Sequence, residues 1–196
     1  MWIWESDSPV TYLGAGENET LYTKSGTSLY AIDTDEGTTR WETRSSIELS
    51  THPAVIDNLL ILGQEDGQVP AIDTETQEEV WNRNLNNGIS TPITMGESTI
   101  YASGWSYPLH AINPENGESK WEFDPEYQPL SPALEVEDTV YVGSDTGTLF
   151  ARSVADGTPQ WSYETESSIW APPAINGEGI YVASESGSII CLTTLQ

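Results

Sequence analysis

The 196-residue sequence contains few basic residues, two histidines and a single cysteine. Its six lysines and arginines stand against 31 aspartates and glutamates, so the formal net charge is −25. A chain this acidic repels phosphate backbones, which makes nucleic acid a poor candidate partner. Cys191 has no second cysteine with which to form an internal disulfide. We expect it to be a small buried apolar residue.

Long apolar runs are also absent from the sequence. No stretch approaches the ~20 apolar residues of a membrane-spanning helix. The opening residues, MWIWESDSP, lack the basic and apolar regions of a secretory signal peptide. We therefore expect neither a transmembrane segment nor an export signal in this chain.

The acidity has three explanations: disorder, a dedicated basic partner, or adaptation to concentrated salt. Disorder is disfavoured because 37% of the residues are hydrophobic, including eight tryptophans and nine tyrosines, which suit a packed core. The carboxylates are scattered along the chain, and salt at roughly 1 M screens such charges beyond about 3 Å. We predict a protein from a salt-loving organism, with a basic partner as the alternative.

A period of 40 residues dominates the sequence. Tryptophans recur at this step at Trp41, Trp81, Trp121 and Trp161. Alanines keep the same step at Ala31, Ala71, Ala111 and Ala151, and Cys191 stands at the next step. Five units are opened by prolines, at Pro9, Pro53, Pro92, Pro132 and Pro172. The period predicts a repeat architecture.

The clearest unit runs from Ser131 to Tyr163. Clusters of turn residues divide it into four short strands, the last of which carries Trp161. Four antiparallel strands form one blade of a β-propeller. No segment holds the 3.6-residue period of a helix, and a β-sandwich does not require identical residues at a fixed step. We predict an all-β propeller of four-stranded antiparallel blades.

The expected propeller is one domain of five blades. The blade bounds are about 9–44, 51–84, 90–124, 130–164 and 171–196. The last unit stops before its tryptophan, and residues 1–5 resemble an isolated fourth strand. We predict that residues 1–5 complete the last blade and close a monomeric ring. The alternative is a part of a larger ring, whose open blade faces would self-associate.

The repeated pattern SP-x-V…VYVGS-x-x-G-x-LYA-I-D-x-x-x-G-x-x-x-W resembles the quinoprotein-type (PQQ-like) propeller repeat. Leu29–Trp41 and Leu109–Trp121 carry it best. The repeat occurs in quinone-dependent alcohol dehydrogenases and in the bacterial outer-membrane assembly lipoprotein, whose propeller is a binding scaffold. The resemblance is closest in character to the second, non-catalytic type. It implies an extracytoplasmic location, and the family usually has eight blades.

The resemblance also implies structural roles for the repeating residues. It implies that the four tryptophans Trp41, Trp81, Trp121 and Trp161 dock one blade against the next. It implies tight turns at Gly37, Gly117 and Gly157. Gln77 stands where the second full unit should have this glycine. We therefore expect that turn to be looser or differently shaped.

Catalytic chemistry finds little support in the sequence. Quinone enzymes of the resembled family use calcium, a catalytic aspartate and often a disulfide between adjacent cysteines, which one cysteine cannot form. Asp33–Gly37 resembles a calcium loop only in part. His52 and His110 fall in different units, away from any nucleophile or zinc motif. We predict no catalytic residue, no metal and no cofactor; a quinone-dependent dehydrogenase-like enzyme or a sensor module is the alternative.

Function is predicted where the sequence breaks its own repeat. The loops between strands two and three and the loops that link blades emerge on the same face of a propeller. The residues that break the repeat on that face are Trp105, Tyr107, Trp170, Tyr127 and His52. Exposed aromatic side chains give large contact area at low entropic cost. We predict a non-catalytic scaffold that binds a protein or a small ligand there, unless these side chains pack on one another.

Overall fold

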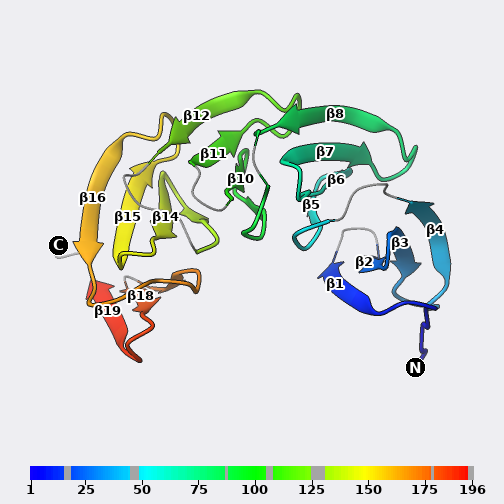
Figure 1. Ribbon diagram of the computed structural model, residues 1–196, viewed down its shortest axis with the longest axis horizontal. Helices are drawn as coiled ribbons and strands as arrows, with labels where there is room; N and C mark the ends of the chain where they lie inside the picture. Colours follow the sequence, from blue (N-terminus) through cyan, green and yellow to red (C-terminus); the bar gives the residue numbers. More distant parts are fainter. Residues whose placement is uncertain are drawn as a thin grey trace. The chain divides into compact units, whose positions relative to one another are not determined.

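The computed structural model describes residues 1–15, 19–44, 49–86, 88–104, 108–124, 131–177 and 179–193. Within these ranges the chain forms 19 β-strands and no helix, arranged as five antiparallel sheets (Figure 1). The predicted all-β fold is therefore confirmed. The chain divides into two compact units, Met1–Ile93 and Thr94–Gln196, and each unit is described by itself. No helix in the described ranges is long and apolar enough to cross a membrane.

Unit 1 contains two four-stranded sheets in which each strand pairs with the next along the chain. The first sheet comprises β1 (Val10–Ala15), β2 (Thr20–Ser25), β3 (Ser28–Asp33) and β4 (Thr39–Arg44). The second comprises β5 (Ala54–Ile56), β6 (Leu59–Ile61), β7 (Gln68–Asp73) and β8 (Glu79–Asn84). Both sheets are the predicted antiparallel blades.

Unit 2 contains three sheets of the same kind. The first comprises β9 (Thr94–Met95), β10 (Ile100–Ala102), β11 (Leu109–Ile112) and β12 (Ser119–Phe123). The second comprises β13 (Leu134–Val136), β14 (Thr139–Gly143), β15 (Thr148–Ser153) and β16 (Pro159–Glu164). The third has three strands in the described part of the chain, β17 (Ala174–Asn176), β18 (Gly179–Ala183) and β19 (Ile189–Thr193).

One row of side chains across each sheet explains the 40-residue period. Ala31 on the third strand pairs with Tyr22 on the second and with Trp41 on the fourth. The two aromatic ring centroids lie 5.8 Å apart over the alanine, which is fully buried. The Tyr101–Trp121 and Tyr141–Trp161 pairs repeat this arrangement at 5.9 and 5.8 Å. Alanine is required because a larger side chain would separate the rings.

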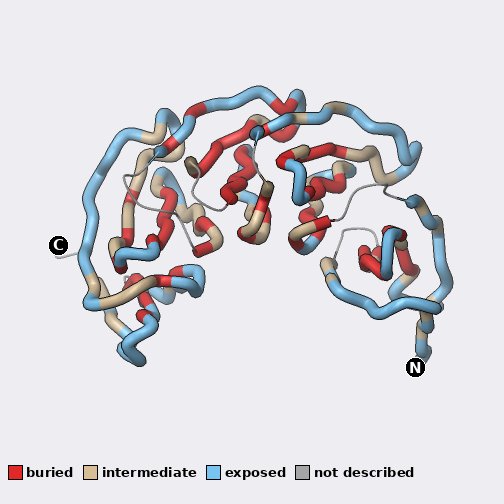
Figure 2. Tube along the Cα trace, in the orientation of Figure 1, coloured by how far each residue is buried: buried red, intermediate tan, exposed pale blue. Residues whose placement is uncertain are grey.

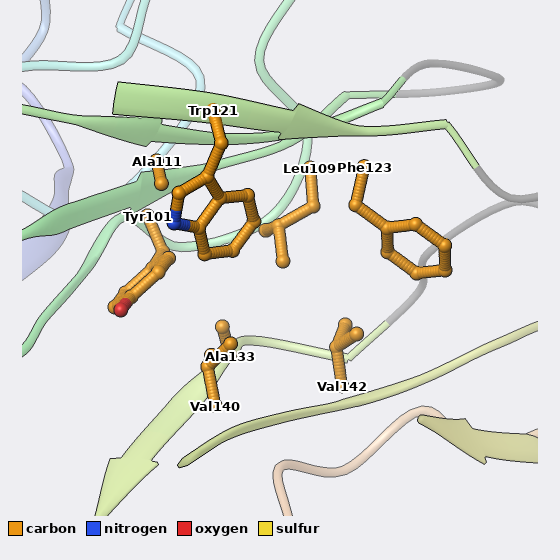
Figure 3. Close-up of a cluster of buried hydrophobic side chains, with 8 residues drawn as sticks. All are labelled: Tyr101, Leu109, Ala111, Trp121, Phe123, Ala133, Val140 and Val142. Carbon is orange, nitrogen blue, oxygen red and sulfur yellow. The ribbon is translucent and has the colours of Figure 1, made fainter. Parts of the chain in front are cut away.

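Burial concentrates in the middle strands of the sheets, whereas the fourth strands are largely exposed (Figure 2). The main core of unit 2 lies between its first and second sheets. Figure 3 shows Trp121 and Phe123 of β12 facing Val140 and Val142 of β14. Trp121 also donates a hydrogen bond of 2.8 Å from Nε1 to the Val154 carbonyl of the next sheet. Within unit 1, Trp41 donates in the same way to the Thr74 carbonyl, at 3.2 Å.

The turn at Gln77 corrects one expectation. Gln77 has a φ of 62°, close to the 70–71° of Gly37, Gly117 and Gly157. Its amide donates to the Asp73 carbonyl at 2.8 Å, as the Gly37 amide does to Asp33. The turn therefore keeps its shape, and the expectation of a different one was wrong. Glutamine adopts the left-handed conformation that glycine adopts without strain.

The strand register corrects the assignment of the unit-opening prolines. Gly14, Ala54, Thr94, Leu134 and Ala174 occupy equivalent positions, because each pairs with the same site of a second strand. Two residues earlier stand Tyr12, His52, Pro92, Pro132 and Pro172. Pro9 and Pro53 therefore do not hold the position of the later prolines. The ladder of the first sheet shifts register between Val10 and Tyr12, which hides this offset from the sequence.

Cys191 occupies the alanine position of β19, since it pairs with Tyr181. It is exposed, so the expectation of a buried residue was wrong. In the other sheets the tryptophan of a fourth strand covers this position. Within the described residues, β19 pairs with β18 alone.

Residues 1–5 lie beside the first sheet without belonging to a strand of it. Trp2 Nε1 donates to the Thr34 carbonyl at 2.7 Å, and Trp4 Nε1 donates to Thr39 Oγ1 at 3.0 Å. The Trp2 ring lies so close to Gly37 that a Cβ there would come within 2.4 Å of it. Trp2 thus contacts the first sheet as Trp121 contacts its following sheet at Val154 and Gly157. Completion of the last blade by this segment stays a prediction.

Candidate ligand-binding face

The two kinds of loop that define the predicted face lie together within each unit. In unit 1, the Ser50 amide donates to the Gly63 carbonyl at 2.9 Å, and Leu49 forms a β-bridge with Gln64. In unit 2, the Ile169 amide donates to the Ser144 carbonyl at 3.0 Å. Each linker between blades therefore runs along the turn between the second and third strands.

Of the five predicted ligand-face residues, two lie in the part of the chain that the structure describes. His52 belongs to unit 1 and Trp170 to unit 2. Trp105, Tyr107 and Tyr127 lie outside the described residues. The role of all five in binding therefore stays a proposal.

His52 is exposed and contacts an aromatic partner that sequence reasoning did not identify. The rings of His52 and Tyr12 meet edge to face, with centroids 4.9 Å apart and planes at 69°. Tyr12 is held in turn by its hydroxyl, which donates to the Ser50 carbonyl at 2.9 Å. Both residues stand at the position that later blades fill with proline. Two consecutive breaks in the repeat are therefore in contact with each other.

Lys24 is the third residue of this cluster. Its equivalents in the other sheets, two residues beyond the site that pairs with the first strand, are Gly63, Ser103, Gly143 and Ala183. Small residues suit this position, because a Cβ on Gly143 would lie 2.3 Å from the Ile169 side chain. Lys24 is only 4% exposed. A lysine among glycines, serine and alanine was a usable signal, but only after the strand register was known.

The Lys24 ammonium group lies between a carbonyl and an aromatic ring. Its Nζ donates to the Leu49 carbonyl at 2.9 Å and lies 5.5 Å from the centroid of the Tyr12 ring. A cation over an aromatic face is attracted by the ring quadrupole. We name Tyr12, Lys24 and His52 the junction cluster, since they join the first and second sheets of unit 1.

Trp170 presents a different surface in unit 2. Its side chain is 49% exposed, and Nε1 contacts Glu185 Oε2 at 3.4 Å. The equivalent residues Ser50 and Ser90 are small and polar. The Ser168 hydroxyl holds the Trp170 loop by donating to the Asp145 carbonyl at 2.7 Å. Trp170 is thus an exposed indole on a loop fixed by hydrogen bonds.

The acidic turns have a structural use. Asp33 Oδ1 accepts hydrogen bonds from the amides of Asp35 and Glu36, both at 2.9 Å, and Oδ2 pairs with Arg40 at 2.7 Å. The Glu36 amide and the Arg40 guanidinium lower the pKa of Asp33. Asp73 caps its own turn in the same way, through the Thr76 and Glu75 amides. In the described ranges, no three His, Cys, Asp or Glu side chains gather as metal ligands.

The antiparallel four-stranded sheets, with their tyrosine–alanine–tryptophan rows, define a β-propeller of the PQQ-like repeat class. The model of the family described as "Outer membrane protein assembly factor BamB" matches residues 2–129 and 109–196. The chain therefore belongs to the BamB family.

Solved structures agree with this fold. BamB from Moraxella catarrhalis superposes with a TM-score of 0.79 at 16% identity, covering 94% of this chain and 60% of that one. The computationally designed proteins Ika4 and Ika8 each give a TM-score of 0.67 at 10% identity. They are covered over 92% and 72% of their lengths, and this chain over 76% and 96%. The chain thus spans about 60% of the length of the BamB structure. No curated protein matches the sequence.

Proposed function

We propose that the chain is a non-catalytic interaction propeller that binds a protein partner through the face carrying His52 and Trp170. One observation carries the proposal: the residues that break the repeat contact one another on that face, while the residues that keep it are used in packing. The BamB structure supports the proposal, because its name describes an assembly factor. A role in assembling other proteins, outside the cytoplasm, belongs to the same proposal.

The face offers the chemistry that protein interfaces use. Exposed tryptophan, tyrosine and arginine residues dominate the binding free energy of many interfaces. Trp170 presents half of its indole on a fixed loop, and His52 is exposed beside a tyrosine that is itself held in place. Because these side chains are already ordered, binding would cost little additional conformational entropy.

Affinity capture with a tagged chain tests the proposal. Proteins retained from an extract of the source organism are quantified for the wild type, for His52→Ala and for Trp170→Ser, which restores the serine of the equivalent position. We expect one or more partners to be depleted by both substitutions. Val80→Ser is the matched control, since Val80 is 50% exposed but lies on the outer strand β8.

Two results would contradict the proposal. Equal capture by all four proteins would show that this face does not bind the partner. Dye reduction upon addition of quinone and calcium would instead support the dehydrogenase-like alternative. Thermal unfolding of each variant accompanies the capture, because a large fall in Tm would assign the residue to packing.

Residues 1–5 support a second, structural proposal. Trp2 bonds the carbonyl 32 residues ahead, and Trp41 and Trp121 bond carbonyls 33 residues ahead. We propose that the segment serves as a fourth strand, completing the last blade as expected. The mass in solution tests this: a monomer supports closure, and a self-associating chain supports a part of a larger ring.

A further inference from the structure

We propose that the junction cluster of Tyr12, Lys24 and His52 is an anion site that receives a carboxylate group of the partner. The inference rests on the proposed function, because it names the chemistry that this end of the binding face recognises. Three observations of unit 1 carry it: the joint break in the repeat, the state of the Lys24 ammonium group, and the placement of the two rings.

The joint break in the repeat is specific to one junction. At the tyrosine and histidine positions, the later blades have proline, and at the lysine position they have glycine, serine or alanine. All three exceptions meet in space, since Tyr12 contacts both other residues. Packing alone does not require them, because blades with proline and a small residue form the same sheets. The cluster therefore has a use that the repeat itself does not supply.

The Lys24 ammonium group is buried without a carboxylate. An ammonium group has three N–H donors, and burial of such a charge is costly unless it is paired. Lys24 Nζ has one acceptor, the Leu49 carbonyl, and the described part of the chain provides no carboxylate within 4.0 Å of it. This occurs in a molecule with 31 acidic residues, any of which could have been placed nearby. The unused donors and the uncompensated charge suit an anionic ligand.

A purely structural role for the ammonium group is covered by other means elsewhere. Lys24 holds the linker at Leu49, and the equivalent residues of the later linkers are Ile89 and Ile169. Ile89 is held by its amide on the Gln64 carbonyl at 3.1 Å, and Ile169 by its amide on the Ser144 carbonyl at 3.0 Å. Backbone hydrogen bonds therefore fix this part of the linker in other blades without any lysine.

The rings define where the carboxylate would lie. Tyr12 separates the buried ammonium group from the imidazole, at 5.5 Å on one side and 4.9 Å between centroids on the other. His52 is exposed, so its ring nitrogens face the partner's side of the cluster. A carboxylate beside His52 accepts an imidazole N–H and lies in the field of Lys24. In a chain of net charge −25, the cluster gives this face a local preference for an anion.

Acetate is the first probe, and the two histidines make it readable. Sodium acetate replaces sodium chloride at constant ionic strength, and the imidazole resonances are followed by two-dimensional NMR of the 15N-labelled chain. We expect saturable shifts at His52 and none at His110, which is buried in β11 and serves as an internal control. Absence of a saturable shift at His52 would overturn the anion site.

Charge substitutions identify the residue responsible. Lys24→Met keeps the aliphatic stem and should weaken the acetate response at least tenfold, whereas Lys24→Arg should retain it. Lys120→Met is the matched control, because it removes the other lysine, which donates to the Ser98 carbonyl in unit 2. A Lys24→Met chain that binds acetate as the wild type does contradicts the proposal. If this variant does not fold, loss of the response in Lys24→Arg contradicts it equally.

Peptides separate the two sources of a carboxylate and the two levels of inference. A hexapeptide with a free C-terminal carboxylate is compared with its amide and with an amide that carries one internal glutamate. Binding of the first alone identifies a chain terminus, and binding of the last identifies an acidic side chain. Partner capture that needs His52 while no carboxylate probe binds would leave the proposed function standing and remove the anion site.

Discussion

The junction of the two sheets in unit 1 differs from the junction of the first two sheets in unit 2. In unit 2, Trp121 is 8% exposed and packs with Phe123 against the valines of β14. In unit 1, Trp41 is only half-buried, and the inner strands place a lysine, a tyrosine and a histidine together. The repeat is kept where the junction is closed and apolar, and it is broken where polar groups reach the surface. Regular positions stabilise the fold, and irregular ones offer chemistry.

Withdrawal of salt should have the largest effect on both junctions. Unit 1 has 16 acidic and four basic residues, and unit 2 has 15 and two, so self-repulsion is similar in both. At roughly 1 M salt the screening length is about 3 Å, and at 0.01 M it is about 30 Å. We expect Tm to rise steadily from low salt to 1 M, with unfolding at the low end. Circular dichroism melts measure it, and a Tm independent of salt would contradict adaptation to a saline environment.

Truncation of the docking tryptophans tests the difference between the junctions directly. Trp121→Ala removes a buried aromatic side chain and should cost about 3–5 kcal/mol of unfolding free energy. Trp41→Ala should cost distinctly less, because part of its ring already contacts solvent. Urea unfolding at fixed high salt measures both. Equal losses would show that the two junctions contribute alike.

Tyr101 supplies a polar contact that strengthens the junction of unit 2. Its hydroxyl donates to Glu135 Oε2 at 2.5 Å, and the Glu97 amide donates to Glu135 Oε1 at 2.9 Å. Tyr101→Phe should cost about 1–3 kcal/mol, since Glu135 loses one of two donors. Urea unfolding at pH 7 measures this loss. Glu97→Ala, which keeps the amide that Glu135 uses, serves as a control.

Alkaline pH gives the same contact a second test. Burial, and then the Glu135 carboxylate, raise the pKa of Tyr101 above its usual value of about 10. The stabilisation is therefore complete below pH 10 and is lost as pH rises above it, by about 1.4 kcal/mol per pH unit. Comparison of the wild type with Tyr101→Phe isolates this contribution among the other tyrosines. A stability difference that stays constant above pH 10 would contradict it.

The fold was predictable because its signals repeat, and the junction cluster was not because its signals occur once. The 40-residue tryptophan and alanine period reports packing rows that every sheet needs, such as Tyr22–Ala31–Trp41. His52 was identified as a break in the repeat, but its partner Tyr12 was hidden by the register shift in β1. Lys24 stood out only beside Gly63 and Gly143, which strand pairing identifies as its equivalents. Sequence spacing alone does not reveal contacts that depend on a bulge.

Gln77 gives the smallest expected effect and the most local account of the difference between the junctions. Gly157 lets the Trp121 ring approach so closely that a Cβ there would lie 2.7 Å from it, and the Trp121 hydrogen bond measures 2.8 Å. Gln77 has a Cβ at the corresponding position, and the hydrogen bond of Trp41 to Thr74 is longer, at 3.2 Å.

Gln77→Gly should therefore allow Trp41 to approach Thr74 more closely. It also relieves a left-handed residue, worth about 1–2 kcal/mol, against about 0.4–1 kcal/mol of added freedom in the unfolded chain. We expect a net stabilisation of about 1 kcal/mol or less, measured by urea unfolding. The converse change, Gly157→Gln, should destabilise unit 2 by more, because the Trp121 ring already fills the space. If both substitutions destabilise equally, the side chain at this turn does not set the closeness of the junction.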